Sequence, residues 1–323
     1  MEYIGNFTKT EQILKKYGFS IRKKYGQNFL IDPNILNKIV DTAEVGKDDI
    51  VLEVGPGLGT LTQYLASRAR RVIAVEIDSH LIPILEETLA DFPNAEVIHE
   101  DILKFDIDAC FERIQKEEES SRNPESALSD GSTAEDCVEN KEKCEKRMHF
   151  KVVANLPYYI TTPVMMKLLT GMTAFDAMLF MVQKEVAERM CAAPGTKDYG
   201  ALTLAASYYT DLKIAGTVPP SCFLPRPNVE SALLYMKVWK EKQVSVKDEK
   251  LMFALIRGSF NQRRKTLVNG IAGFEGLPYT KDEVREALEA VGLPATVRGE
   301  ALTLAQFAAL ADQLSLRSRQ SGE

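Results

Sequence analysis

The sequence predicts an α/β protein in which an open parallel sheet is followed by a smaller all-helical domain. An apolar strand over 49–54 runs into three glycines and a helix over 61–67, and a second strand over 71–75 comes next. Strands that alternate with helices in this way are typical of parallel sheets. Beyond residue 240 the composition shifts to helix formers, which predict helices over 249–260, 263–272, 281–291 and 303–313.

The turn after the first strand predicts a site for a nucleoside-containing ligand. Gly55, Gly57 and Gly59 allow a sharp backbone turn between strand and helix. Glu53 lies two residues before Gly55, which favours a positively charged ligand over a phosphate group. Glu76 ends the next strand, where a carboxylate can accept hydrogen bonds from both ribose hydroxyls. S-adenosylmethionine meets these requirements, and the Gly-x-Gly-x-Gly spacing differs from that of dinucleotide binders.

A third predicted strand, 96–99, is followed by Glu100 and Asp101. The carboxyl ends of strands form the ligand-binding edge of an open parallel sheet. Asp101 can therefore accept a hydrogen bond from the adenine amino group of the ligand. The sequence allows a second interpretation equally well, in which Asp101 only caps the turn that follows it.

The segment Asn155-Leu156-Pro157-Tyr158 follows the predicted strand 151–154 and suits methyl transfer to an adenine amine. This amine is a poor nucleophile because its lone pair is delocalised into the ring. The side-chain oxygen of Asn155 and the carbonyl oxygen of Leu156 can both accept its N–H groups, which favours a pyramidal nitrogen with an available lone pair. Pro157 biases Leu156 away from helical dihedrals, and Tyr158 offers a flat face on which the base can stack.

Phe223 begins a proline-rich connection, 223–228, between two predicted strands over 212–218 and 229–238. The prolines stiffen this connection and would hold the ring in a fixed place. We predict that Phe223 lies opposite Tyr158 and completes an aromatic sandwich around an extruded base.

Length and composition indicate a soluble globular protein. The 323 residues are 45% hydrophobic, which is enough for a well-buried core. No apolar run approaches the roughly 18 residues of a membrane-spanning helix, and residues 1–10 lack the layout of a signal peptide. We therefore expect a cytoplasmic protein without membrane association. The five cysteines and three histidines lack the spacing of ligands, so neither a disulfide framework nor a metal site is predicted.

Positive charge is concentrated near both ends of a chain whose net charge is −6. Residues 1–30 carry six basic and two acidic side chains, and residues 250–274 carry five basic and no acidic ones. A solvated charged surface is one interpretation of each region, and contact with RNA phosphates is the other. The candidate RNA-binding residues are Arg22, Lys23, Lys24, Arg263, Arg264 and Lys265.

Residues 112–149 interrupt the α/β pattern with charged, serine-rich sequence. They include eleven acidic and seven basic residues, a net charge of −4, and almost no β-branched or aromatic residues. Such a segment buries too little apolar surface to offset the entropy lost on ordering. We predict an insertion that is disordered or loosely helical.

Together these segments resemble the KsgA-type family of rRNA adenine dimethyltransferases, in the family's order along nearly the whole chain. The matching motifs are 25–30 (YGQNFL), 53–59 (EVGPGLG), 76–78 (EID), 100–101 (ED), 155–158 (NLPY), 223–231 (FxPxPxVxS) and 260–265 (FNQRRK). The resemblance implies a Rossmann-like class I S-adenosylmethionine-dependent methyltransferase sheet of seven strands with a C-terminal helical domain. The insertion at 112–149 is the one departure from the pattern.

The resemblance also implies the site and the reaction. Its cofactor-binding residues would be Asn28, Leu30, Gly55, Gly57, Glu76, Asp101 and Asn155. Its contacts to the target adenine would be Asn155, Leu156, Tyr158 and Phe223. The implied reaction places two methyl groups on N6 of each of two adjacent adenosines in the 3′-terminal hairpin loop of small-subunit rRNA. The implied partner is this rRNA in a ribosomal assembly particle, and we expect a monomer.

Three parts of the chain are expected: a basic arm over 1–30, a methyltransferase domain over 31–240 and a helical domain over 241–323 for rRNA contact.

Three other functions stay open. A large-subunit rRNA dimethyltransferase of the macrolide-resistance type shares the core, but residues 22–30 and 261–265 fit the small-subunit enzyme better. An assembly factor without catalysis is disfavoured by the intact glycine turn. A DNA adenine methyltransferase is disfavoured by Leu156, where that group usually has proline.

Overall fold

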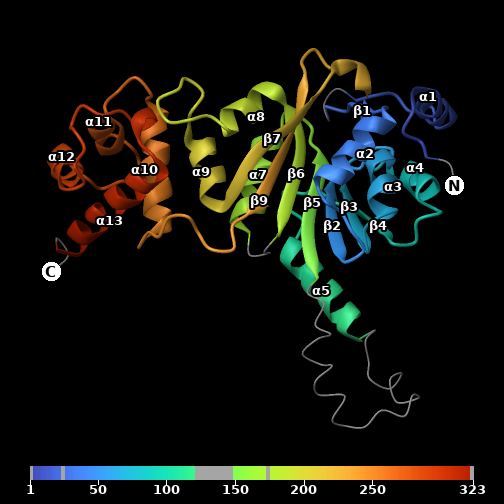
Figure 1. Ribbon diagram of the computed structural model, residues 1–323, viewed down its shortest axis with the longest axis horizontal. Coiled ribbons are helices and arrows are strands. Elements are labelled where there is room, and N and C mark those ends of the chain that lie inside the picture. Colours follow the sequence, from blue (N-terminus) through green and yellow to red (C-terminus); the bar gives the residue numbers. More distant parts are fainter. Residues whose placement is uncertain (1–2, 23–25, 121–147, 172–174, 321–323) are drawn as a thin grey trace, which may run out of the picture. The chain divides into compact units, whose positions relative to one another are not determined.

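The computed structural model describes residues 3–22, 26–120, 148–171 and 175–320. The chain divides into two compact units, Met1–Val182 with Val218–Tyr235, and Gln183–Thr217 with Met236–Glu323. The first unit contains the central strands of a sheet, and the second is mainly helical (Figure 1).

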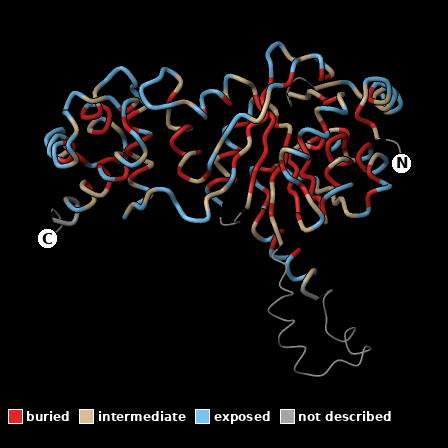
Figure 2. The backbone as a smooth tube through the Cα atoms, viewed as in Figure 1, coloured by how far each residue is buried: buried red, intermediate tan, exposed pale blue. Residues whose placement is uncertain are grey.

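A parallel sheet forms the centre of the first unit. Strand β2 (Asp49–Val54) pairs in parallel with β3 (Arg71–Glu76) on one side and with β5 (His149–Asn155) on the other. Parallel pairs also join β3 to β4 (Ala95–His99) and β5 to β6 (Ala177–Gln183). Every residue of β2 is buried, and Figure 2 shows buried backbone along the central strands. An apolar sequence without alternation is what a strand covered on both faces requires.

The complete sheet has seven strands in the order β4-β3-β2-β5-β6-β9-β7, which confirms the predicted fold. The last two are β9 (Ser231–Val238) and β7 (Thr210–Val218). The chain runs outward from β2 to β4 and then returns to the other side of β2 as β5. The strand order therefore reverses between β2 and β5, which is where open α/β sheets bind their ligands.

The helices of the first unit begin at local signals in the sequence. Asp32 caps the N-terminus of α2 (Pro33–Thr42), because its side chain accepts hydrogen bonds from the backbone N–H groups of Asn34 and Ile35. Gly59, at φ +82°, makes the sharp turn into the helix that follows β2. The helices are α1 (Phe7–Lys16), α2 (Pro33–Thr42), α3 (Thr60–Ala66), α4 (Ile82–Thr88), α5 (Ile107–Ser120) and α7 (Thr161–Thr170).

A second, two-stranded sheet was not predicted. Strand β1 (Phe29–Leu30) pairs antiparallel with β8 (Phe223–Leu224), which follows the short 3₁₀ helix η3 (Pro220–Cys222). The backbone N–H of Ile31 extends the pairing by donating to the carbonyl of Cys222 at 2.8 Å. This small sheet fixes the end of the N-terminal arm beside the proline-rich connection.

The second unit packs helices around one apolar core. Its helices are α8 (Lys184–Met190), α9 (Ala201–Tyr209), α10 (Glu249–Asn261), α11 (Leu267–Ala272), α12 (Lys281–Ala290), the 3₁₀ helix η4 (Gly299–Ala301) and α13 (Leu304–Gln320). Leu204 and Tyr208 of α9 share this core with Leu255 of α10 and Phe307 of α13. The division into units therefore differs from the expected boundary at residue 240, because α9 contributes its apolar side chains to the helical core.

The insertion begins later than predicted. Residues 112–120 are the second half of α5, and residue 149 already belongs to β5. Arg113 on α5 bonds to Glu117 at 2.9 Å and to Glu96 on β4 at 2.8 Å, and Arg71 on β3 bonds to the same two carboxylates. Ile114, which is fully buried, also anchors this half of α5. Of the two predicted alternatives, disorder or a loose helix, residues 112–120 therefore take the helix, while 121–147 lie outside the described residues.

A second difference concerns the predicted helix over 263–272. The structure places residues 262–265 in a turn, and α11 begins only at Leu267. Across the described ranges, no helix is long and apolar enough to cross a membrane.

Candidate active site

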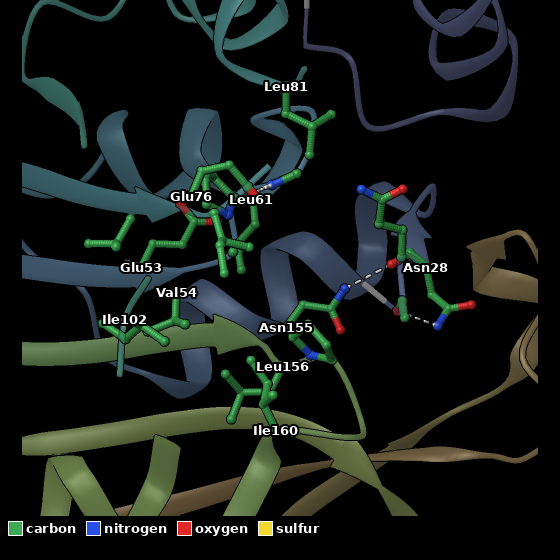
Figure 3. Close-up of a pocket in the computed structure, with 18 of the residues that line it drawn as sticks. Asn28, Glu53, Val54, Leu61, Glu76, Leu81, Ile102, Asn155, Leu156 and Ile160 are labelled. Atoms are coloured by element: carbon green, nitrogen blue, oxygen red, sulfur yellow. Dashed lines mark hydrogen bonds between the residues drawn. The ribbon is translucent and has the colours of Figure 1, made fainter. Parts of the chain in front are cut away.

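A cavity of about 290 Å³ opens where the carboxyl ends of four adjacent parallel strands meet in the first unit (Figure 3). Its walls are the glycine turn after β2, the end of β3, the loop after β4 and the loop after β5, together with residues 26–30 of the N-terminal arm. The predicted residues that line it are Asn28, Leu30, Gly55, Gly57, Glu76, Asp101, Asn155, Leu156 and Tyr158.

The glycine turn requires glycine for two reasons. Gly55, Gly57 and Gly59 have φ values of +69°, +63° and +82°, a region that other residues rarely adopt. Space is also restricted, since a Cβ on Gly57 would lie 3.1 Å from the ring of Phe29. The turn therefore forms part of the cavity wall with backbone atoms that carry no side chains.

Glu76 lies at the end of β3 with its carboxylate fixed by backbone donors. Its Oε1 accepts from the N–H of Asp78 at 2.8 Å, and its Oε2 accepts from the N–H of Gly57 at 3.3 Å. Only 5% of the residue is exposed. Burial raises the pKa of Glu76 above its ordinary value, and these two N–H groups oppose that shift. The carboxylate keeps lone pairs for ligand hydroxyls.

Glu53 is a second buried acidic residue of the site. It is 1% exposed, and its Oε2 accepts no hydrogen bond from any described residue. Burial is the main reason that the pKa of Glu53 rises from 4.5 to about 8. The Thr62 hydroxyl opposes this rise, and the nearby charge of Glu76 adds to it. A buried acceptor without a partner is costly unless a ligand supplies a donor.

Asp101 caps a turn, which is one of the two roles that the sequence left open. Its Oδ1 accepts from the backbone N–H of Leu103 at 2.9 Å, so it caps the turn after β4. The same residue lines the cavity. One carboxylate oxygen therefore caps the turn, and the hydrogen bond of Asp101 to an adenine amine stays a prediction.

Asn155, at the end of β5, has its carboxamide oriented by the N-terminal arm. Its Nδ2 donates to the carbonyl oxygen of Asn28 at 3.0 Å, as the dashed line in Figure 3 shows. This bond leaves Oδ1 as an acceptor at the cavity. The next residue, Leu156, is held by its N–H, which donates to the carbonyl of Met181 at 3.2 Å. Its own carbonyl accepts no hydrogen bond from the described part of the chain.

The two predicted aromatic residues lie in different environments. Tyr158 lines the cavity, and its hydroxyl is 2.8 Å from Oγ of the buried Ser231. Phe223 is only 1% exposed and does not line the cavity, because β8 pairs it with Leu30 of β1. The stacking role of Phe223 stays a prediction.

Apolar side chains that the sequence analysis did not single out also line the cavity. Ile77, 43% exposed, follows Glu76, and Ile102 follows Asp101. Leu103 and Tyr159 are 41% and 56% exposed. Their place in the sequence could have identified them, since each follows a predicted site residue directly or after one further residue. Exposed apolar side chains at a cavity rim suit a flat aromatic ligand.

The basic candidates are distributed over both units. Arg22 lies 3.7 Å from the buried carboxylate of Asp78, whereas Lys23 and Lys24 lie outside the described residues. Within the second unit, the guanidinium of Arg263 donates to the carbonyl of Tyr199 at 3.1 Å and to Glu300 at 3.4 Å. The other two predicted residues, Arg264 and Lys265, are exposed on the turn between α10 and α11.

The described residues contain no group of three or more His, Cys, Asp or Glu side chains placed to hold a metal ion. Of the acidic residues at the cavity, Glu76 and Asp101 accept hydrogen bonds from backbone N–H groups.

A seven-stranded sheet with a glycine turn and acidic strand ends at its reversal point defines the class of Rossmann-like methyltransferases. Solved structures share this fold. A dimethyladenosine transferase from Plasmodium falciparum superposes with a TM-score of 0.66 at 24% identity over 91% of this chain and 98% of that one. The 23S rRNA methyltransferase ErmE gives a TM-score of 0.59 at 25% identity over 89% and 100%.

The sequence comparison defines the family within this class. Residues 18–307 match the family Ribosomal RNA adenine dimethylase, and the chain belongs to it. One relative, the ribosomal RNA small subunit methyltransferase A of Lachnoclostridium phytofermentans, is 50% identical over 97% of this chain and 98% of its own length.

Proposed function

We propose that the protein transfers methyl groups from S-adenosylmethionine to N6 of two adjacent adenosines in small-subunit rRNA, giving N6,N6-dimethyladenosines. Family membership and the relative named as a small-subunit methyltransferase support this function. The structural observation that carries it is the oriented carboxamide of Asn155, which directs an acceptor oxygen to a cavity at the sheet reversal.

The residues present fit S-adenosylmethionine, which supplies an electrophilic methyl group when bound. Glu53 offers a buried oxygen without a partner, which suits an ammonium group. Glu76 has the position for ribose hydroxyls, and Asp101 has a carboxylate oxygen for an adenine amine. Leu30 and Ile102 add apolar contact. The cavity volume is near the lower end of the roughly 300–1,000 Å³ found for small-molecule sites.

The target amine would be held by two acceptors from adjacent residues. Oδ1 of Asn155 and the carbonyl oxygen of Leu156 would each accept one N–H group, which keeps the nitrogen pyramidal and directs its lone pair away from both oxygens. Tyr158, fixed through Ser231, would stack on the base. The nitrogen becomes acidic as the methyl group is added, so its proton passes to water and no strong general base is needed.

The shifted pKa of Glu53 gives a prediction about the ligand-free protein. The folded-state value of about 8 exceeds the ordinary value of 4.5, so folding favours the protonated acid. The stability contributed by protonated Glu53 is complete below pH 4.5 and is lost as the pH rises through about 8. Glu53→Gln, which mimics the protonated acid, should therefore melt several degrees higher than wild type at about pH 8, with the gap closing toward about pH 5. Thermal melts across this range would contradict the assignment if the gap were independent of pH.

RNA phosphate contact is proposed for Arg263, Arg264 and Lys265, which are all exposed. Arg264 and Lys265 are the pair to test, because Arg263 is also bonded to Tyr199 and Glu300 within the protein. Replacing both by alanine should weaken rRNA binding and reduce the slope of log K against log salt by about 1 for each lost contact. Affinity for S-adenosylmethionine should not change.

The matched control for this prediction is Lys281→Ala with Arg285→Ala, which removes the same charge from α12 in the same unit. Binding is measured by filter retention over a range of salt concentrations. An equal loss of slope in both double variants would show that only net charge matters, and an unchanged slope in the first would move the RNA contact elsewhere.

The function is tested by parallel reactions of the protein with labelled S-adenosylmethionine and three substrates: unmethylated small ribosomal subunits, large subunits and duplex DNA. Label in the small subunit alone is expected. Label in the large subunit alone would indicate the activity named for ErmE, and cofactor binding without any transfer would indicate an assembly factor.

We further propose that the protein acts in the cytoplasm as a monomer on a ribosomal assembly particle.

A further inference from the structure

The carboxamide of Asn155 takes its orientation from a backbone atom of a distant segment. Its Nδ2 donates to the carbonyl of Asn28 at 3.0 Å, so the direction of Oδ1 depends on where residues 26–30 lie (Figure 3). Downstream, the pairing of β1 with β8 holds this segment. Upstream, the chain turns at Gly26, where φ is +58°.

The side chain of Gln27 fixes the upstream part. Its Nε2 donates to Oδ2 of Asp78 at 3.0 Å, and its Oε1 accepts from the backbone N–H of Arg22 at 2.9 Å. Asn28 adds a local bond, since its own Nδ2 donates to the carbonyl of Gly26 at 3.0 Å. The position of the Asn28 carbonyl is thus linked to the location of Asp78.

Asp78 is itself rigidly held at the end of β3. It is 1% exposed, and its Oδ1 accepts from the backbone N–H of His80 at 3.2 Å and lies 3.0 Å from Nδ1 of the same residue. The Asp78 backbone N–H donates to Oε1 of Glu76 at 2.8 Å. A buried carboxylate is costly without such donors, and with them it stays in one place. Hydrogen bonds therefore connect Glu76, through Asp78 and Gln27, to the segment that orients Asn155.

We propose that Gln27 and Asp78 are positioning residues for methyl transfer: their hydrogen bond holds the Asn28 carbonyl where it orients the carboxamide of Asn155 toward the target amine. The proposal deepens the proposed function and rests on it. Neither side chain takes part in the chemistry, so disturbing the bond should slow the transfer step more than it weakens cofactor binding.

The test is a polarity reversal of this one hydrogen bond. Gln27→Glu places two carboxylates against each other and should lower kcat at least about tenfold, with KM for S-adenosylmethionine changing less than about threefold. Asp78→Asn places two carboxamides there and should have a smaller effect in the same direction. In the double variant the introduced amide donates to the introduced carboxylate, and kcat should return to within about threefold of wild type.

Two further measurements separate positioning from general stability. Tyr17→Phe removes a hydrogen bond to Glu87 that fastens the same arm further upstream, and its kcat should equal that of wild type. The side-chain amide resonance of Asn155 in ¹⁵N spectra, assigned by its loss in Asn155→Ala, should shift in Gln27→Glu and return in the double variant.

The outcomes separate the two proposals. The positioning role is overturned if Gln27→Glu has the wild-type kcat, or if the double variant does not regain the kcat that Gln27→Glu loses. The proposed function stands in both cases, provided that the wild-type protein transfers methyl groups. A wild-type protein that transfers no methyl group to small subunits overturns the proposed function, and the positioning role with it.

Discussion

Asn155→Ala is expected to lower the rate of methyl transfer by about 10²-fold or more, the usual cost of removing one preorganised hydrogen-bonding group from a transition state. The residue supplies an acceptor whose direction is set by the bond from its Nδ2 to the Asn28 carbonyl. Removing it leaves the amine lone pair in conjugation with the ring. Single-turnover transfer to small subunits measures the effect on the chemical step.

Asn155→Asp is the matched variant, because it keeps an oxygen at the position of Oδ1 and removes the donor. Its second oxygen would face the carbonyl of Asn28, so we expect activity between those of alanine and wild type. Near-normal turnover in Asn155→Ala, with cofactor affinity also unchanged, would exclude the proposed role.

Glu76→Ala should raise the dissociation constant for S-adenosylmethionine by about 10²-fold, since hydrogen bonds to a charged group are each worth about 1.5–3 kcal/mol. The N–H groups of Asp78 and Gly57 position the carboxylate before the cofactor binds. Binding therefore loses little side-chain entropy at this residue. Isothermal titration of the ligand-free protein gives the constant directly.

Glu76→Gln separates charge from shape in this measurement. It retains one acceptor oxygen, so an intermediate affinity is expected. If the alanine variant bound the cofactor as tightly as wild type, the ribose would have to lie elsewhere in the cavity.

The central part of the fold and site could be predicted because it depends on local patterns. The apolar run of β2 and its three glycines identify a strand, a turn and a helix without reference to other segments. Glu76, Asp101 and Asn155 each end or follow a strand, and parallel topology brings such positions to one edge. Their meeting at one cavity therefore follows from the order of elements.

The features that were missed depend on contacts between distant segments. Strands β1 and β8 have two residues each, too few for any periodicity, and they are far apart in sequence. Their pairing buries Phe223, which the sequence placed at the target base. The bond between Gln27 and Asp78 is equally non-local.

The partners of charged residues could not be predicted for the same reason. Composition alone treats residues 112–120 as too polar to order, yet Arg113 and Glu117 find partners on β3 and β4. Arg263 looks like its two neighbours in sequence, but the carbonyl of Tyr199 and the carboxylate of Glu300 engage it. A sequence pattern shows that charge is present and does not show which charges already have partners.

The most direct test of the account is mass spectrometry of rRNA fragments after the protein has acted on unmethylated small subunits with S-adenosylmethionine. We expect two adjacent N6,N6-dimethyladenosines in the 3′-terminal hairpin loop, formed about 10²-fold or more slowly with Asn155→Ala. Methylation at any other nucleotide, at the large subunit alone, or to the same extent in the Asn155 variant would contradict it.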